Sequence, residues 1–179
     1  MSKLEINNKA VDLRNQIDGI LTSSGYRYTR SGTTDKLIRY NLGMSLATGE
    51  TDLIILCHFD RGFIEIVSTV PFKVPEKYKR EVALYLHEVN LRMNVGHFDF
   101  DISNRIIHSR TSILMKDLML DQEVFDKCLY LNLNVIEDFI PGVMRIIYAD
   151  QTAISAMEDI MNQLKTNTEN GNQNAQISE

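Results

Sequence analysis

The spacing of apolar residues changes at Gly96. Over residues 78–93, apolar side chains recur every three or four positions, which predicts an amphipathic helix with one face against a core. Over residues 97–102, apolar and polar residues alternate, and this period of two predicts a half-buried strand. Residues 106–114 follow a short polar turn and predict the return strand of a hairpin. One face of the hairpin would then join the core while the other faces water.

The residues before this helix predict another helix followed by an antiparallel meander. Apolar positions from 10 to 21 have helical spacing. A short strand is expected at residues 26–30, and alternation over residues 38–44 predicts a half-buried strand. Residues 52–59 are apolar almost throughout, which indicates a central strand, and residues 63–70 follow a tight turn. Strands joined by such short turns are expected to pair antiparallel.

The residues after the hairpin predict a long helix that is apolar on more than one side. It is expected to begin after Asp121, and Pro141 should kink it or restart it. A further helical segment is expected after Asp150, with apolar residues at regular spacing up to Leu164. A helix that is apolar on two sides needs two partners to cover it.

Together these elements predict the fold class α+β, in the order α-β-β-β(-β)-α-β-β-α, with an antiparallel sheet of five to six strands packed against helices. Residues 1–164 are expected to form a single domain, because 179 residues with 44% hydrophobic content can bury a substantial core. Residues 165–179 are polar almost throughout, so we expect a disordered tail there.

Composition and charge narrow the classes of partner. The chain has no apolar run of the roughly 18 to 20 residues that cross a bilayer, and its first residues lack the apolar stretch of a secretory signal. We therefore expect a cytoplasmic protein without membrane contact. The formal charge is −5, and no stretch gathers the lysines and arginines that phosphate binding requires, so nucleic acid is not an expected partner. Cys57 and Cys128 have apolar neighbours and are expected to be buried free thiols.

The sequence lacks the motifs of common catalytic and cofactor sites. Its glycines are scattered, without the GxGxxG or GxxxxGK spacing of nucleotide-binding loops, and no serine lies in a GxSxG context. We therefore expect no catalytic residue, no cofactor and no metal. One polar cluster is expected on the water-facing side of the hairpin, and it comprises His97, Asp99, Asp101, His108 and Arg110. Strand spacing brings at most two or three of these together, so we interpret them as cross-strand ion pairs, with a metal site as the alternative.

The surplus apolar face of the long helix and of the segment after it is a candidate partner surface. Its residues are Phe125, Leu129, Ile136, Phe139, Ile154, Met157, Met161 and Leu164. Other apolar residues, among them Leu131 and Val135, widen the face of the long helix. Methionines near a chain end suit an adaptable surface, although core packing accounts for a methionine stripe equally well. A partner protein, a homodimer, or the segment after Asp150 folding back would each cover this face.

Several of these features together resemble one known family. They are the meander after Gly25, the helical sequence VPEKYKREVALYLHEVN, the residues 90–96 followed by HFDFD, and the long helix that contains Pro141. Over about residues 5–148, the chain resembles the YbjN-like family of bacterial sensory transduction regulators. The resemblance implies a fold similar to that of type III secretion chaperones, a tendency to form dimers, and no established catalytic residues. The chain departs from the family pattern in its hairpin turn and in the helix and polar tail after Asp150.

Two functions remain open at the level of the sequence. The first is a non-enzymatic cytosolic module, chaperone-like, that binds a partner protein or acts as a regulator, and the wide apolar face of the long helix motivates it. The second is a small-molecule sensor or weak enzyme that uses a pocket between sheet and helices. Its support is the polar hairpin face with its histidines. The apolar face favours the first function over the second.

Overall fold

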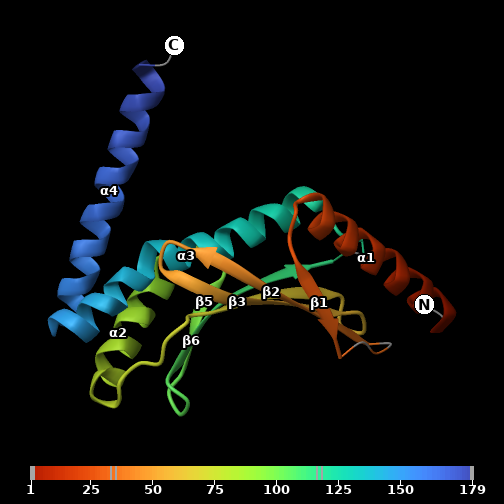
Figure 1. Ribbon diagram of the computed structural model, residues 1–179, viewed down its shortest axis with the longest axis horizontal. Helices are drawn as coiled ribbons and strands as arrows, with labels where there is room; N and C mark the ends of the chain where they lie inside the picture. Colours follow the sequence, from red (N-terminus) through yellow and green to blue (C-terminus); the bar gives the residue numbers. More distant parts are fainter. Residues whose placement is uncertain (1–2, 33, 35, 116, 118, 178–179) are drawn as a thin grey trace.

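The computed structural model describes residues 3–32, 34, 36–115, 117 and 119–177. In chain order the elements are α1 (Lys3–Ser23), β1 (Tyr28–Ser31), β2 (Leu37–Leu46), β3 (Gly49–His58), β4 (Phe63–Thr69), the short 3-10 helix η1 (Glu76–Tyr78), α2 (Lys79–Asn90), β5 (His97–Asp101), β6 (Ile106–Leu114), α3 (Gln122–Ala149) and α4 (Ala153–Ile177) (Figure 1). This order confirms the α+β class that the sequence predicts.

The strands form one antiparallel sheet in the spatial order β1-β2-β3-β4-β6-β5. Strands β1 to β4 are neighbours in the order of the chain, which is the expected meander. The β5-β6 hairpin joins this meander through β6, which pairs with β4. The sheet therefore has six strands, the upper value of the expected range.

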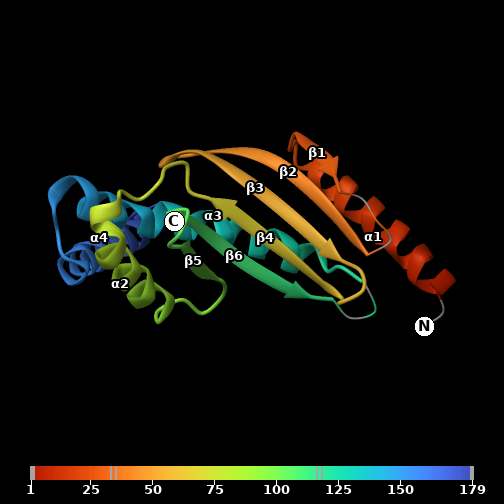
Figure 2. The ribbon, with the colours of Figure 1, turned by 90° about the horizontal axis from the view of Figure 1, so that it is seen from below.

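The helices lie on one face of the sheet. Buried residues of α1 and of the first half of α3 pack against Ile38, Tyr40 and Ile55 of the meander. Buried residues of α2, the second half of α3 and α4 pack against Phe98 and Ile107 of the hairpin. In Figure 2 the opposite face of the sheet is turned toward the viewer and carries no helix among the described elements. We call it the open face.

A polar cluster centred on Asn132 lies between these two parts of the core. Asn132 is fully buried on α3, and its amide nitrogen donates to the hydroxyls of Ser109 and Thr111 and to the carbonyl oxygen of Ile66, each at 3.2 Å. The Ser68 hydroxyl donates to the Asn132 amide oxygen at 2.5 Å. The cluster therefore fixes α3 to β4 and β6 through directional bonds, in addition to apolar packing.

Helix α3 continues through Pro141 as one element, so the restart that the sequence allows does not occur. Beside the proline, the hydroxyl of Tyr85 on α2 donates to the carbonyl oxygen of Phe139 at 2.7 Å. The Tyr85 ring is fully buried, and burial raises the pKa of its hydroxyl. The ring lies so close to Gly142 that a Cβ atom there would overlap it. Helices α2 and α3 thus approach each other where α3 has no side chain.

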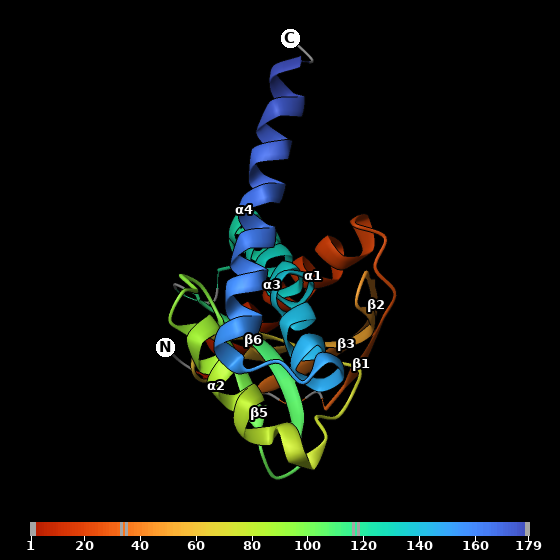
Figure 3. The ribbon, with the colours of Figure 1, turned by 90° about the vertical axis from the view of Figure 1, so that its left-hand side faces the viewer.

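Helix α4 folds back onto α2 and α3. Its buried residues are Ala153, Ala156, Met157 and Ile160. The carboxylate of Glu81 accepts a hydrogen bond from the backbone N–H of Ala153 at 2.8 Å, and Arg145 pairs with Asp159 at 2.7 Å. Figures 1 and 3 show that the rest of α4 projects away from the body of the molecule. The structure has a helix up to residue 177 where the sequence predicts a disordered tail, and the domain boundary at residue 164 stays a prediction.

Replacing Met157 and Met161 together by aspartate is expected to lower the free energy of unfolding by about 3 kcal/mol without changing the mass of the particle. Met157 is 5% exposed, and a carboxylate there would lose its hydration. Thermal unfolding and light scattering measure the two quantities. The matched control is Ile154→Asp on the same helix, where the side chain is 71% exposed and no loss of stability is expected. A dimer that becomes monomeric would show instead that α4 mediates self-association.

The two cysteines differ in burial. Cys57 is 1% exposed, and burial raises the pKa of its thiol to about 12. Cys128 on α3 is only half-buried, so the expectation that both thiols are buried is wrong for Cys128. The reason is that α3 places Cys128 at the margin of the α1 side of the core, where it packs against the buried cluster without being enclosed by it. Both thiols are free.

The edge of the sheet at β5 is engaged by the end of α2. The amide nitrogen of Asn90 donates to the carbonyl oxygen of Phe98 at 2.9 Å, and the Phe98 N–H donates to the Asn90 amide oxygen at 2.7 Å. Asn90 thereby bonds both backbone groups of Phe98, as a residue of a neighbouring strand would.

Candidate functional site

Polar side chains from all six strands lie on the open face of the sheet. The register of the strands places Thr29, Arg39, Asn41, Gly43, Asp52, Ile54, Leu56, His58, Glu65, Val67, Thr69, Ser112, Arg110, His108, His97 and Asp99 on this face. The polar hairpin residues predicted from the sequence therefore lie on the side away from the helices. They therefore do not line a pocket between the sheet and the helices.

A ladder of alternating basic and acidic side chains crosses the open face from β3 to β5. His58 lies 3.2 Å from Glu65, which accepts from Arg110 at 2.9 Å. Arg110 also donates to Asp99 at 2.7 Å, and Asp99 lies 3.2 Å from His97. Four strands thus contribute to one network, and the cross-strand pair of Asp99 and Arg110 belongs to it. Glu65, on β4, is a member that the sequence did not suggest.

The remaining polar hairpin residues have local partners. His108 shares a hydrogen bond of 3.0 Å with the Thr69 hydroxyl, and its pKa is lowered by burial and then by Arg110. The carboxylate of Asp101 accepts hydrogen bonds from the backbone and the side chain of Asn104, and these bonds lower its pKa. The bond to Asp99 raises the pKa of Arg110. Within the described residues, no three His, Cys, Asp or Glu side chains lie together as metal ligands would.

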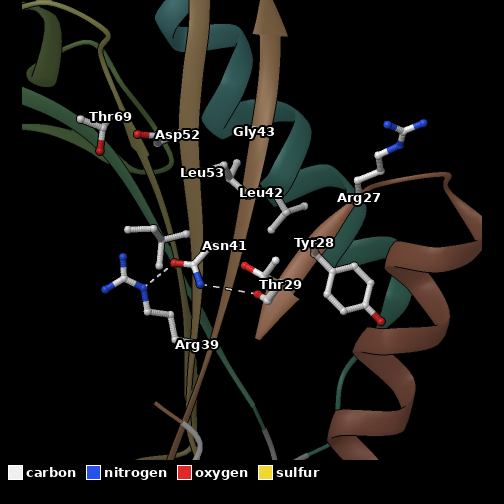
Figure 4. Close-up of a pocket in the computed structure, with 11 residues that line it drawn as sticks. Arg27, Tyr28, Thr29, Arg39, Asn41, Leu42, Gly43, Asp52, Leu53 and Thr69 are labelled. Atoms are coloured by element: carbon white, nitrogen blue, oxygen red, sulfur yellow. Dashed lines mark hydrogen bonds between the residues drawn. The ribbon is translucent and has the colours of Figure 1, made fainter. Parts of the chain in front are cut away.

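Two adjoining cavities hollow the open face around Gly43. The first, of about 540 Å³, is lined by Arg27, Tyr28, Thr29, Arg39, Asn41, Leu42, Gly43, Asp52, Leu53, Ile54 and Thr69 (Figure 4). The second, of about 510 Å³, is lined by Gly43, Glu50, Thr51, Asp52, Thr69, Val70, Pro71, Phe72, Lys73 and Ile106. The two share Gly43, Asp52 and Thr69, and we call them together the Gly43 trough. None of the five predicted hairpin residues lines it. The only sequence signal for this site is a glycine inside a predicted strand.

The candidate partner surface predicted from the sequence is divided by the structure. Phe125, Leu129, Ile136 and Met157 are buried in the core, so for these four the prediction of a surface is wrong. The sheet covers one side of α3, while α2 and α4 cover another. Ile154 is exposed. The three half-buried members are Phe139, Met161 and Leu164.

Phe139 belongs to an apolar groove along α3. Leu131, Val135 and Phe139 follow one another at helical spacing, and they face Met93 and Val95 of the segment after α2 across a cavity of about 370 Å³. Arg92 and Asn94 of the same segment also line this cavity. Leu131 is 38% exposed and Val95 is 45% exposed. We call the five apolar residues the α3 groove. The widened face of α3 was predicted from the sequence, but Met93 and Val95 were not, because they come from a different part of the chain.

No helix in the described part of the chain is long and apolar enough to cross a membrane. No curated protein sequence matches the chain. Solved structures that are similar to it include the following two. The crystal structure of YbjN from E. coli is 11% identical, with a TM-score of 0.49, over 68% of this chain and 84% of that one. The crystal structure of the ExsC-ExsE complex is 15% identical, with a TM-score of 0.33, over 52% of this chain and 68% of that one.

A family model matches the chain over residues 13–144, which runs from α1 to the last turns of α3. Its description is "Putative bacterial sensory transduction regulator". The match includes the meander, α2 and the hairpin, which are the features that carry the resemblance in the sequence. It ends before α4 begins. The chain belongs to the YbjN family.

Proposed function

We propose that this YbjN-family chain is a non-enzymatic cytosolic regulator that works by binding an amphipathic helix of a partner polypeptide. The observation that carries the proposal is the α3 groove. Five of the seven residues that line its cavity are apolar, and three of these five lie on one stripe of a helix. A stripe of this kind facing a second apolar wall is the arrangement that receives the apolar face of another helix.

The packing of α3 explains why no other helix of the described structure fills the α3 groove. The helix contacts the sheet, α2 and α4, and its buried residues pack in those contacts. Helix α4 contacts α3 around Arg145, which pairs with Asp159, whereas Leu131, Val135 and Phe139 line the cavity on the side of the segment after α2. Within the described residues, the opposite wall of their cavity is the segment 92–95. An apolar strip that the chain covers only in part can serve as a surface for another molecule.

The family supports the regulatory part of the proposal. The description of the matched family is that of a regulator of sensory transduction, a role that is exercised through another molecule. A partner protein and a second copy of the chain can both supply a helix, and the experiment below separates them because the captured polypeptide is identified by mass.

Substituting Leu131 by aspartate is expected to reduce capture of the partner at least tenfold, which corresponds to about 1.4 kcal/mol of binding free energy. The tagged variant and the wild type are used to capture proteins from a lysate of the source bacterium, and mass spectrometry quantifies each captured protein. Leu131 is 38% exposed, so the carboxylate can reach water and the fold should persist. Circular dichroism checks this.

The matched control is Tyr130→Asp, which places the same charge on the adjacent residue of α3. Tyr130 is 63% exposed and does not line the groove. Capture should therefore be unchanged in this variant. If the two variants lose the same proteins to the same extent, or if neither loses any, the groove is not the binding site.

A further inference from the structure

Gly43 lies in the interior of β2, and nothing in the local structure requires a glycine there. The pairing of β2 with β3 is continuous on both sides of Gly43, so the position is not a bulge. Its φ is not positive. A Cβ atom added to it would meet no atom within 4 Å. A glycine inside a strand weakens the strand, and the close approach of another molecule is one of the structural reasons for a glycine at such a position.

Gly43 forms part of the floor shared by both cavities of the Gly43 trough. The trough extends from β1, at Thr29, to β6, at Ile106. In the order of the sheet these strands are four spacings apart, which is about 19 Å at about 4.8 Å a spacing. About six residues of extended polypeptide have this length, at roughly 3.3 Å a residue. An elongated trough of this size fits a chain better than a compact ligand.

The unpaired charges in the trough are mostly positive. Arg27 and Lys73 have no ion-pair partner among the described residues, and the same is true of Arg39, whose Nε donates to the neutral amide oxygen of Asn41 at 2.7 Å. Asp52 is the one carboxylate of the trough without a hydrogen-bond partner in the described part of the chain. Glu50 accepts a hydrogen bond from the neutral hydroxyl of Ser45 and likewise has no ion-pair partner in the described structure. Three unpaired cations therefore lie with two unpaired anions, and this small positive balance is opposite in sign to the net charge of −5 of the chain.

We propose that the Gly43 trough binds an extended, acidic segment of a polypeptide, laid across the strands with its backbone passing over Gly43. Acidic side chains of the segment face Arg27 and Arg39 at one end and Lys73 at the other. The sheet backbone at Gly43 is already paired, so side chains and the exposed Cα of the glycine make the contacts. The inference rests on the proposed function in that the ligand is a polypeptide, but its site is separate from the α3 groove.

The test uses a displayed library of random twelve-residue peptides, selected on the full-length wild-type protein at low salt. Selected peptides are then measured by fluorescence anisotropy against the wild type, Gly43→Phe, and the matched control Ser112→Phe. Phenylalanine is a good strand residue, so Gly43→Phe should fill the trough and keep or raise the thermal midpoint. Ser112 is exposed on the same face, opposite Glu65, and lines neither cavity.

We expect enrichment of peptides rich in aspartate and glutamate, whose affinity falls at least tenfold in Gly43→Phe and less than twofold in Ser112→Phe. Their affinity should also fall as the salt concentration rises. The inference is overturned if the selected peptides bind Gly43→Phe as well as they bind the wild type, or if they are basic. It is also overturned if free glutamate or inorganic phosphate alone binds the wild type and not Gly43→Phe while no peptide does, since the trough would then be a small-anion site.

Including Leu131→Asp in the same measurement separates the two proposals. Peptides that lose affinity in Leu131→Asp but not in Gly43→Phe would support the α3 groove and refute the trough. Peptides with the reverse pattern would support the trough even if capture of a partner by the groove fails.

Discussion

Replacing Gly142 by alanine will lower the free energy of unfolding by about 3 kcal/mol, the upper part of the range for an overpacked core. The added Cβ would lie 2.7 Å from Cε2 of Tyr85 and closer still to its Cζ and hydroxyl oxygen. The ring cannot swing away, because it is fully buried and its hydroxyl is bonded to Phe139. The two helices must therefore separate. Urea unfolding monitored by circular dichroism measures the loss.

The same substitution at Gly19 provides the control. Gly19 is also inside a helix, but a Cβ added there meets no atom within 4 Å. Gly19→Ala should raise stability by up to about 1 kcal/mol, since alanine is the better helix former. In addition, Tyr85→Leu should cost less in the Gly142→Ala background than in the wild type. Equal stability of the two alanine variants would mean that the Tyr85 ring leaves enough space for a Cβ atom at residue 142.

Replacing Asn132 by alanine will lower the free energy of unfolding by about 3 kcal/mol. The substitution removes the partner of the Ser68 hydroxyl and the donor to Ser109 and Thr111, all of which are buried. Buried polar groups left without partners keep the full cost of their desolvation. The control is Asn134→Ala on the same helix. Asn134 is half-buried and makes no side-chain hydrogen bond within the described structure, so a change within about 0.5 kcal/mol is expected.

Asn132→Asp tests the same cluster through its pH dependence. A carboxyl group at this buried position should have a pKa above its ordinary value, because burial disfavours the charged form. The folded state then binds more protons than the unfolded state between the two pKa values, so stability relative to the wild type falls as the pH rises through that window and recovers as it falls. Unfolding at pH 5 and pH 7 measures this. A relative stability that is the same at both values would show that the position is open to water.

Local patterns were sufficient for the fold because most elements have one buried and one exposed face. The alternation over residues 38–44 and the apolar residues 52–59 correspond to β2 and β3, whose partners are close in the chain. Pro141 predicted either a kink or a restart, and the restart is absent. A proline removes one hydrogen bond and crowds the preceding turn of the helix, and packing of α3 on both sides can compensate for this cost. Whether a long helix continues through a proline depends on its packing against distant elements, and a local sequence pattern does not record that packing.

The candidate sites were harder to predict, because they depend on segments that are distant in the chain. Burial of Met157 depends on α2, whose Glu81 anchors α4 across 72 residues. Asn132 could have been recognised, since it lies three residues after Leu129 and four before Ile136, in the middle of a buried stripe. Gly43 could not have been recognised as part of a site. The alternation of apolar and polar residues marks it only as a position facing away from the core and gives no information about cavities.

The pairing of Asn90 with Phe98 has a consequence for how the protein behaves at high concentration. An exposed outer strand is a template on which other chains can add strands and build fibrils. At Phe98 the groups that such an addition would use are already occupied by the amide of Asn90. A strand added at this point would have to displace the side chain of Asn90, which belongs to α2. Asn90 thus blocks the addition of a strand at Phe98, and Asn90→Ala would remove this barrier to aggregation along β5.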